Sequence, residues 1–268
     1  MAIPIALTIA GSDSGGGAGI QADLKTFSAL GVYGASVITA ITAQNTRGVS
    51  GVADVAADMV TAQLDAVFQD LEIAAVKIGM LSRVDTIAAV AAGLRRYEPR
   101  HVVLDPVMVA KSGDRLLHAE AIGALIDQLL PLATLVTPNL PEAMVLGGWS
   151  GAVSEAEMPA IARAVRDRGA QAVLLKGGHL DAADSPDLLV TASGQRMFRA
   201  TRRITDNTHG TGCTLSSAIA ALLARGKPLD DAIAGAKAYL TEAIAAADQL
   251  EVGHGHGPVH HFHALWTR

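Results

Sequence analysis

The chain has 268 residues, of which 50% are hydrophobic and only 3% aromatic, and its formal net charge is −5. It has no cluster of lysine and arginine of the kind that binds nucleic acid, and no apolar run approaches the ~18 residues of a membrane span, so small molecules are the expected partners. A single cysteine forbids an intrachain disulfide, and with a start that carries no positively charged leader it predicts a cytoplasmic protein.

The same composition predicts the class of fold. Alanine, valine, leucine and glycine are prominent, which is typical of a parallel sheet covered by helices on both faces. No linker rich in proline or serine and no block of charge divides the chain. We therefore expect a single α/β domain over residues 1–268.

The first predicted unit is a strand, a glycine-rich loop and a helix. The apolar run 5–10 predicts a buried strand, the loop 11–19 follows, and an apolar stripe over 20–30 predicts a helix with Gly31 as its C-cap. The loop matches neither of two familiar nucleotide-binding motifs. The dinucleotide fingerprint needs a glycine where Ile20 stands, and the lysine and hydroxyl residue of a P-loop are absent.

Strands and helices then alternate with a period of about 30 residues, which indicates serial βα units. Further strands are predicted at 36–42, 75–78, 102–104, 135–137 and 172–175. Helices are predicted at 58–71, 85–96, 119–130, 154–168, 213–224 and 229–247. Segment 188–198 alternates on both sides of Ser-Gly and predicts a hairpin, so the expected sheet is mostly parallel with an antiparallel edge.

Polar residues or glycines follow one predicted strand after another. In chain order they are Gly11 and Asp13, Gln44 and Asn45, Gly79 and Met80, Asp105, Asn139 and Glu142, and Lys176 to His179. A lone aspartate after a strand is more often a helix cap, but a whole series is not explained in that way. Because ligands bind at the carboxyl ends of the strands in open parallel sheets, we expect an active site along this edge.

A second glycine-rich loop, 205–214, opens the predicted helix 213–224. Gly210 and Gly212 lack a Cβ, so backbone amides can approach a bound group closely, and the helix dipole favours a phosphate there. In the first turn a threonine hydroxyl, Thr211 or Thr214, is expected to cap the helix, and the pKa of the Cys213 thiol is expected to be lowered. The alternative is a glycine loop that only starts a packed helix.

These residue types together predict a kinase. The carboxylates of Asp105 and Glu142, with the Asn139 amide, suit one or two Mg²⁺ ions shared with substrate phosphates. Lys176 offers a positive charge for a transferring phosphoryl group, although a lysine at a strand end can also be merely solvated. With the anion-binding loop, this set matches phosphoryl transfer from a nucleotide, in which positioning and charge stabilisation dominate.

Motifs spread along nearly the whole chain carry a family resemblance. They lie at 10–13, 16–23, 43–46, 77–80, 105–108, 137–142, 207–214 and 251–255. They resemble the hydroxymethylpyrimidine/phosphomethylpyrimidine kinases of thiamine biosynthesis, a branch of the ribokinase-like superfamily. One departure is Gly15, where members of this family usually carry Ser or Thr.

The resemblance implies a three-layer ribokinase-like fold, usually a homodimer, and ATP- and Mg²⁺-dependent phosphorylation of 4-amino-5-hydroxymethyl-2-methylpyrimidine and then of its monophosphate. It assigns the pyrimidine pocket to Gln44, Asp23, Gly11, Met80 and Val107. It assigns the metal to Asp105 and Glu142, and the nucleotide phosphates to Asn139, Lys176, Thr208 and Gly210. The amide of Gln44 suits an aminopyrimidine, since it offers both a donor and an acceptor.

Cys213 stands where the wider superfamily usually has an aspartate acting as general base. The expected catalytic residues are therefore Cys213, Lys176, Gly210 and Gly212. A thiolate at the helix N-terminus would take the substrate proton, and the alternative is that the thiol only fills space against the substrate.

Other functions remain open at this point. A vitamin B6 kinase would share the fold and the ATP site, and a catalytically silent nucleotide or pyrimidine sensor would share the pocket. A cysteine hydrolase built on Cys213 lacks a placed base, because no sequence rule brings His209 within reach. The histidine-rich end, 254–263, is interpreted as a segment docked through Val259, Phe262, Leu265 and Trp266 rather than as a metal site.

Overall fold

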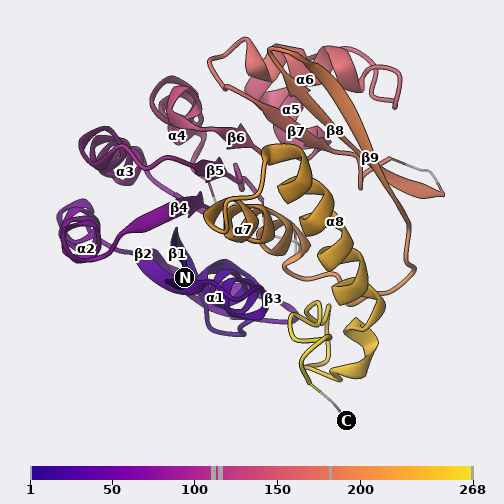
Figure 1. Ribbon diagram of the computed structural model, residues 1–268, viewed down its shortest axis with the longest axis horizontal. Helices are drawn as coiled ribbons and strands as arrows, with labels where there is room; N and C mark the ends of the chain where they lie inside the picture. Colours follow the sequence, from indigo (N-terminus) through magenta and orange to yellow (C-terminus); the bar gives the residue numbers. More distant parts are fainter. Residues whose placement is uncertain (1, 110–112, 114–116, 181–182, 267–268) are drawn as a thin grey trace.

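A computed structural model describes residues 2–109, 113, 117–180 and 183–266 (Figure 1). The strands are β1 (Ile5–Asp13), β2 (Tyr33–Asn45), β3 (Gly48–Asp54), β4 (Ile73–Ile78), β5 (Val102–Leu104), β6 (Leu135–Val136), β7 (Val173–Lys176), β8 (Asp184–Thr191) and β9 (Gly194–Thr201). The α-helices are α1 (Gly19–Ala29), α2 (Ala57–Asp70), α3 (Val84–Tyr97), α4 (Ala119–Ala124), α5 (Leu140–Gly147), α6 (Met158–Arg166), α7 (Thr211–Ala224) and α8 (Leu229–Ala245). Within the described ranges no helix combines the length and the apolar character that crossing a membrane requires.

The nine strands lie in one sheet, in the order β3-β2-β1-β4-β5-β6-β7-β8-β9. The central strands β2, β1, β4, β5, β6 and β7 pair in parallel. At one end of the sheet β3 pairs antiparallel with β2, and at the other end β7, β8 and β9 pair antiparallel. The predicted mostly parallel sheet with an antiparallel edge hairpin is confirmed, whereas the second antiparallel edge, β3, is not anticipated by the sequence pattern.

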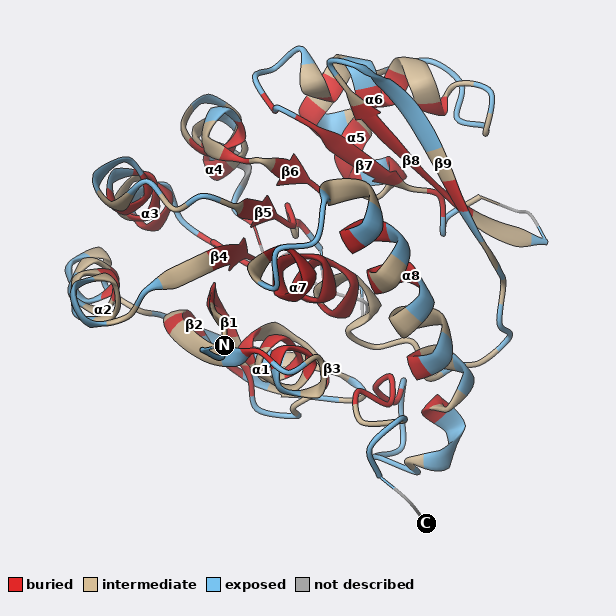
Figure 2. Cartoon of the chain, in the orientation of Figure 1, coloured by how far each residue is buried: buried red, intermediate tan, exposed pale blue. Residues whose placement is uncertain are grey.

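Alternate residues of the central strands pack on opposite faces of the sheet, as the pleat of a strand requires. Leu7 and Ile9 of β1 belong to the core formed with α2 to α6, while Ala6 belongs to the core formed with α1, α7 and α8. In β5, Val103 likewise points away from the core that Val102 and Leu104 join. Figure 2 shows buried residues along the strands and on the inward sides of the helices, so the fold has three layers.

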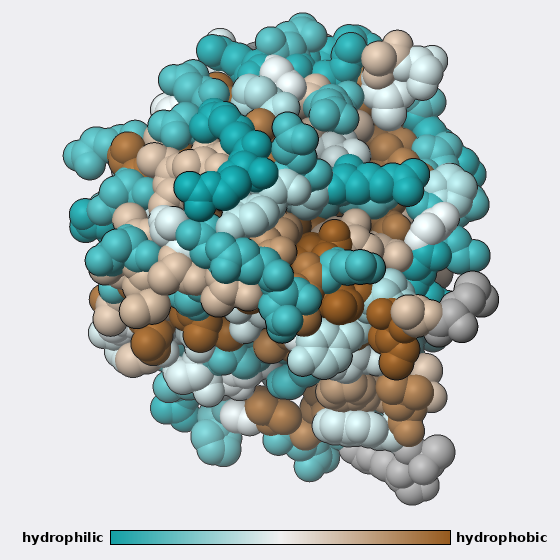
Figure 3. Space-filling view, turned by 60° about the vertical axis from the view of Figure 1, so that its left-hand side comes forward, coloured by the Kyte–Doolittle hydropathy of each residue, from teal (hydrophilic) through white to brown (hydrophobic). Residues whose placement is uncertain are grey.

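The outer surface is mixed. Figure 3 turns the side of α2 and α3 toward the viewer and shows mostly hydrophilic residues, with apolar ones gathered in the lower half of the view. Such a polar outer face is what an amphipathic covering helix presents to water.

Several predicted boundaries are wrong. The predicted helix 119–130 is an α-helix only as far as Ala124, where α4 ends. The chain continues as a π turn (Leu125–Leu129) and a 3-10 turn (Leu130–Leu132), because Pro131 cannot extend an α-helix. α6 begins at Met158, whereas the predicted helix begins at 154. The sequence pattern does not predict α5, because its 8 residues are too few to show an apolar stripe. β2 extends to Asn45, so Gln44 lies inside the strand rather than after it.

Candidate active site

The carboxyl ends of the parallel strands and the N-terminus of α7 meet at one edge of the sheet. Gly212 lies in the first turn of α7, and a Cβ added to it would stand 3.5 Å from both Asp105 Oδ2 and Lys176 Nζ. Asp105 follows β5 and Lys176 is the last residue of β7. The structure thus brings together three residues that the sequence assigned to one site, and the missing Cβ of Gly212 leaves room beside a charged pair.

Asp105 and Lys176 form an ion pair of 2.9 Å whose side chains are only 2% and 14% exposed. The hydroxyls of Thr137 and Ser216 also donate to Asp105, over 3.2 Å and 3.3 Å. Burial opposes the charge of Asp105, but Lys176 and Lys77 hold its pKa below its usual range. Lys176 is therefore not a solvated strand-end lysine but one held in place by a buried anion.

Asn139 and Glu142 form a capping box at the start of α5. The Asn139 side-chain oxygen accepts from the Glu142 amide over 2.9 Å, and the Asn139 amide donates to Glu142 Oε2 over 2.8 Å. Burial raises the pKa of Glu142 to about 7, with Lys176 opposing and Asp105 adding to the rise. Because the oxygen of Asn139 is used in the cap, its NH₂ group is what it can offer to a phosphate.

The described part of the chain holds no cluster of three or more His, Cys, Asp or Glu that could bind a metal alone, and this includes the C-terminal histidines. Asp105 and Glu142 are nevertheless close enough for the charge of Asp105 to raise the pKa of Glu142. Mg²⁺ in kinase sites is usually held by one or two carboxylates together with substrate phosphates. This donor set fits such a shared ion rather than a cage made by protein alone.

The two glycine-rich loops are joined through Asp13 at the end of β1. Its carboxylate accepts from the amides of Gly15, Gly17 and Ala18, over 2.8 Å, 3.0 Å and 2.8 Å, and from His209 Nε2 at 3.0 Å. Burial opposes ionisation, but the His209 hydrogen bond and those backbone amides hold the pKa of Asp13 below its usual range. Asp13 therefore orders the first loop as an anion and links it to the second.

Gly210 shows why the second loop needs glycine. Its φ is 80°, a left-handed conformation, and a Cβ there would lie 1.9 Å from the carbonyl oxygen of Gly17. No side chain fits at that contact. The sequence identified both glycine loops but not the Asp13–His209 contact, because these residues are 196 positions apart.

The residues expected to line the pyrimidine pocket are only partly assembled there. Gln44 is half-buried near the end of β2, and its amide lies against Thr42 and His209. Gly11 faces Met80, since a Cβ on Gly11 would lie 3.1 Å from Met80 Cε. Val107, two residues beyond Asp105, is half-buried, as is Thr208 in the second glycine loop.

Asp23 is the exception and requires a correction. Its side chain and that of Lys77 are both 0% exposed, and Lys77 Nζ lies 2.9 Å and 2.8 Å from its two oxygens. Thr8 and Ser217 donate to the same carboxylate over 2.6 Å and 2.5 Å. With every contact inside the protein, Asp23 lies under the site and does not line it.

Lys77 was missed as a site residue, although a lysine inside the apolar strand β4 is a visible signal, since buried lysines occur almost only in pairs. Burial alone would lower its pKa, but the negative charge of Asp23, with further contributions from Cys213 and Asp105, raises it. Lys77 is therefore a permanent positive charge beneath Cys213.

The predicted ionisation of Cys213 is wrong. Burial raises the pKa of the thiol to about 11, and neither the charge of Lys77 nor a backbone hydrogen bond from Gly19 reverses this. His209 contacts Asp13 and Gln44, so it does not supply the base that the cysteine hydrolase lacks. The predicted hydroxyl cap is also wrong, because Gly210 caps α7 without a side-chain hydrogen bond.

A thiol of this pKa should react slowly. We expect iodoacetamide to alkylate Cys213 at pH 7.5 about 100-fold more slowly than free cysteine, and the rate to rise steeply up to about pH 11, because only the thiolate attacks. Intact-protein mass spectrometry over time measures the rate. The urea-unfolded chain is the control, and a folded protein that reacts as fast as free cysteine would contradict the raised pKa.

The histidine-rich C-terminal segment docks beside the second glycine loop, as expected. His209 donates its amide to Gly257 over 3.0 Å and accepts from Val259 over 3.3 Å. Val259 and His261 are buried, and burial lowers the pKa of His261 to about 3. The prediction is wrong for Leu265 and Trp266, which are 59% and 61% exposed.

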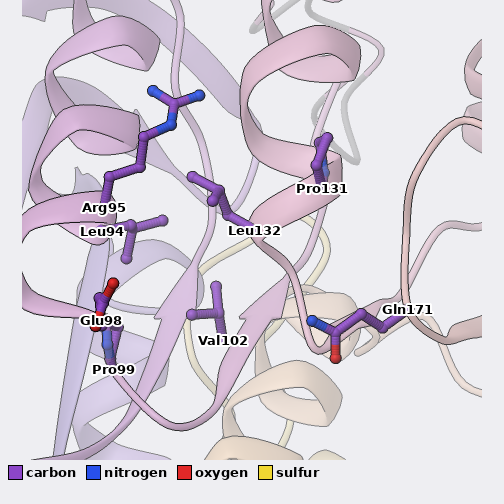
Figure 4. A pocket seen from close by; sticks show the side chains of 8 residues that line it. All are labelled: Leu94, Arg95, Glu98, Pro99, Val102, Pro131, Leu132 and Gln171. Carbon is purple, nitrogen blue, oxygen red and sulfur yellow. The ribbon is translucent and has the colours of Figure 1, made fainter.

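A separate hollow of about 360 Å³ lies at the opposite edge of the sheet (Figure 4). Its lining includes Leu94, Arg95, Pro131 and Gln171, together with Val102, the first residue of β5. It therefore faces the amino ends of the strands, whereas the polar strand ends described above lie at the carboxyl edge. Its charged residues are Arg95 and Glu98, and none of the residues assigned to the active site lines it.

Comparison with known proteins shows the family of the chain. The family described as phosphomethylpyrimidine kinase matches residues 13–260. The chain is also 64% identical over 262 residues to the hydroxymethylpyrimidine/phosphomethylpyrimidine kinase of Rhizobium meliloti, covering 98% of each. The chain belongs to the phosphomethylpyrimidine kinase family.

Solved structures similar to this member of the phosphomethylpyrimidine kinase family carry two names. A phosphomethylpyrimidine kinase from Clostridium difficile is 46% identical with a TM-score of 0.80, covering 90% of this chain and 99% of that one. An ADP complex of Bacillus subtilis pyridoxal kinase is 37% identical with a TM-score of 0.91, covering 99% and 100%. The ribokinase-like fold is thus established, but it does not by itself select the substrate.

Proposed function

We propose that the chain transfers the γ-phosphoryl group of ATP to the hydroxymethyl oxygen of 4-amino-5-hydroxymethyl-2-methylpyrimidine, and then phosphorylates the monophosphate, in thiamine biosynthesis. The observation that carries the proposal is the buried Asp105–Lys176 pair beside the amides that open α7. A lysine and a helix N-terminus that face one space stabilise a transferring phosphoryl group. The identity to the Rhizobium meliloti kinase supports the choice of substrate.

In this reaction the substrate oxygen bonds to the γ-phosphorus, the bond from that phosphorus to the bridging oxygen breaks, and ADP leaves. Lys176 and the amides of Gly210 and Gly212 are assigned to the charge that moves between these oxygens. Asn139 and Thr208 are assigned to the nucleotide phosphates. The hydroxyl proton departs late in a loose transfer and passes to an oxygen of the transferred phosphoryl group or to water, so the protonated Cys213 is not needed as a base and serves as a wall against the substrate.

Mg²⁺ belongs to the same proposal, with Asp105 and Glu142 as its protein ligands. When bound with the nucleotide, the ion would neutralise part of the negative charge of the phosphates. The pairing of Asp105 with Lys176 fits this role, because both then sit where phosphate charge arrives. The ADP complex of the Bacillus subtilis neighbour supports a nucleotide as a ligand of this fold.

Steady-state assays test the proposal directly. Purified protein with ATP and Mg²⁺ is given the hydroxymethylpyrimidine, its monophosphate or pyridoxal, and ADP release is measured. We expect turnover of both pyrimidines. Absence of ADP release from folded protein with either pyrimidine would refute the function and favour a sensor.

Pyridoxal phosphorylation is the second candidate, because the TM-score of 0.91 to a pyridoxal kinase exceeds the 0.80 to a phosphomethylpyrimidine kinase. The sequence identities give the opposite order, 37% to the pyridoxal kinase and 46% to the phosphomethylpyrimidine kinase. We expect kcat/KM to be higher for the aminopyrimidine than for pyridoxal. The reverse order would make vitamin B6 the substrate.

We also assign the enzyme to the cytoplasm as a homodimer. The single cysteine suits a reducing compartment. We place the dimer contact at the β2–β3 edge, where Ile41 and Val52 are 57% and 47% exposed on opposite faces of the sheet and a second chain would cover them. Light scattering after size exclusion measures the mass, and a monomer at micromolar concentration would contradict the dimer.

Gln44→Leu should raise KM for the pyrimidine by about 10- to 100-fold with little change in KM for ATP. The reason is that leucine leaves the polar edge of the bound pyrimidine unpaired, a cost of about 1–3 kcal/mol. Gln44 is only half-buried, so thermal stability should stay close to that of the wild type. An unchanged KM for the pyrimidine would remove Gln44 from the pocket.

A further inference from the structure

The side-chain amide of Gln44 lies between two groups that restrict its orientation. The structure places its nitrogen 3.4 Å from His209 Nε2 and its oxygen 3.1 Å from Thr42 Oγ1. Its backbone is also fixed, since the Gln44 amide donates to Ser14 Oγ over 2.8 Å and Ser14 Oγ donates to the Gln44 carbonyl over 2.7 Å. Only the amide polarity, oxygen or nitrogen on each side, is left to determine.

His209 Nε2 cannot accept a hydrogen bond from Gln44. Its Nε2 lies 3.0 Å from Asp13 Oδ2, and an ionised carboxylate only accepts hydrogen bonds, so this nitrogen must carry a proton. Asp13 is 3% exposed and already accepts from backbone amides, which keeps it anionic. A ring nitrogen that carries a proton cannot accept from the amide nitrogen of Gln44.

Thr42 can only accept from Gln44. A hydroxyl has a single hydrogen, and that of Thr42 points to the carbonyl of Ser12 at 2.9 Å, a group that has no hydrogen to give. Thr42 is only 4% exposed, so water is not an alternative partner for its hydroxyl. The group that faces Thr42 Oγ1 must therefore be a donor.

The two halves of an amide have nearly the same shape, and their assignment follows from the partners. An amide nitrogen beside His209 would set two donors against each other and would ask one threonine hydrogen to serve two acceptors. We propose that Thr42 and His209, the latter held by Asp13, are positioning residues that fix the Gln44 amide with its oxygen toward His209 and its NH₂ toward Thr42. The Gln44 NH₂ then donates to Thr42, and the Gln44 oxygen lies 3.4 Å from the N–H that His209 directs mainly to Asp13, so no two donors and no two acceptors face each other.

An amide that is fixed in one orientation recognises only one pattern of hydrogen-bond donor and acceptor on its substrate. Its free edge offers N–H on the Thr42 side and oxygen on the His209 side, which matches a ring nitrogen beside an exocyclic amine. An edge of reversed polarity, a ring N–H beside a carbonyl, would meet two mismatches unless the amide could turn over. This selectivity rests on the proposed function, with Gln44 at the aminopyrimidine edge.

The test compares the 4-amino substrate with its 4-oxo analogue, 5-hydroxymethyl-2-methylpyrimidin-4(3H)-one. For the wild type we expect kcat/KM to favour the amino compound by about 100-fold or more. In Thr42→Val and in His209→Phe the ratio should fall by about tenfold, because a freed amide adapts to either edge. Thr42→Ser, which keeps the hydroxyl, should restore the ratio.

His263→Phe and Thr26→Val are matched controls outside this cluster, since His263 contacts the His260 carbonyl and Thr26 the Ala22 carbonyl, and their ratios should equal that of the wild type. If the Thr42 and His209 variants lose activity toward both compounds equally, the positioning role is overturned. If the wild type fails to phosphorylate the amino compound, the proposed function fails instead. Independently of folding of the variants, ¹⁵N NMR of the wild type must show a protonated Nε2 on His209, and an unprotonated one overturns the assignment.

Discussion

Lys176→Met is expected to lower kcat for the pyrimidine by about 100-fold or more while KM for ATP changes far less. Methionine keeps an unbranched apolar stem but removes the positive charge 2.9 Å from Asp105. The charge of Lys176 matters most when phosphoryl charge is moving, so its loss should appear in kcat. Initial rates at saturating and limiting ATP separate the two parameters.

The same variant leaves Asp105 buried without its main partner, so a loss of stability must be separated from a loss of catalysis. Lys237→Met is the matched control. Lys237 is also a buried lysine, 8% exposed and 2.5 Å from Asp187, but it lies on α8 outside the assigned site. It should lower the melting temperature while kcat stays close to that of the wild type. Equal kcat losses in both variants, or a Lys176→Met enzyme that loses only ATP affinity, would contradict the catalytic role of Lys176.

The meeting of Asp105, Lys176 and Gly212 could be predicted from the sequence because it depends on a local rule. Short apolar runs mark parallel strands, and whatever follows each strand arrives at the same edge. β3 could not be found in this way, because Gly48–Asp54 is mostly exposed and has no alternation of apolar residues. The rule works where one face is buried and fails where neither face is.

Contacts between residues far apart in the chain escaped prediction for another reason. Asp13 and His209 meet only because the first and second glycine loops fold against each other. For Cys213, the helix N-terminus that favours a thiolate is visible in the sequence, but the burial that outweighs it is not. Local sequence therefore indicates which groups are present at the site, and the packing around them decides their protonation.

Lys77→Met is expected to lower the free energy of unfolding by about 3–5 kcal/mol. Both side chains of the Lys77–Asp23 pair are 0% exposed, and the substitution leaves a carboxylate buried with only the hydroxyls of Thr8 and Ser217. Urea unfolding followed by circular dichroism measures the loss. A second readout is Cys213, whose pKa should rise further and whose alkylation should slow, because the charge of Lys77 now lowers that pKa.

The double variant Lys77→Met/Asp23→Asn separates a buried charge from lost packing. Asparagine keeps the size of Asp23 and an oxygen that accepts from Thr8 and Ser217, but it has no charge that would be left unpaired in the interior. If the cost of Lys77→Met is an unpaired anion, the double variant should be more stable than the single one, with a coupling energy of about 2 kcal/mol or more. Additive losses would instead show that Lys77 contributes through packing alone, and its role as the charge beneath Cys213 would then have to be abandoned.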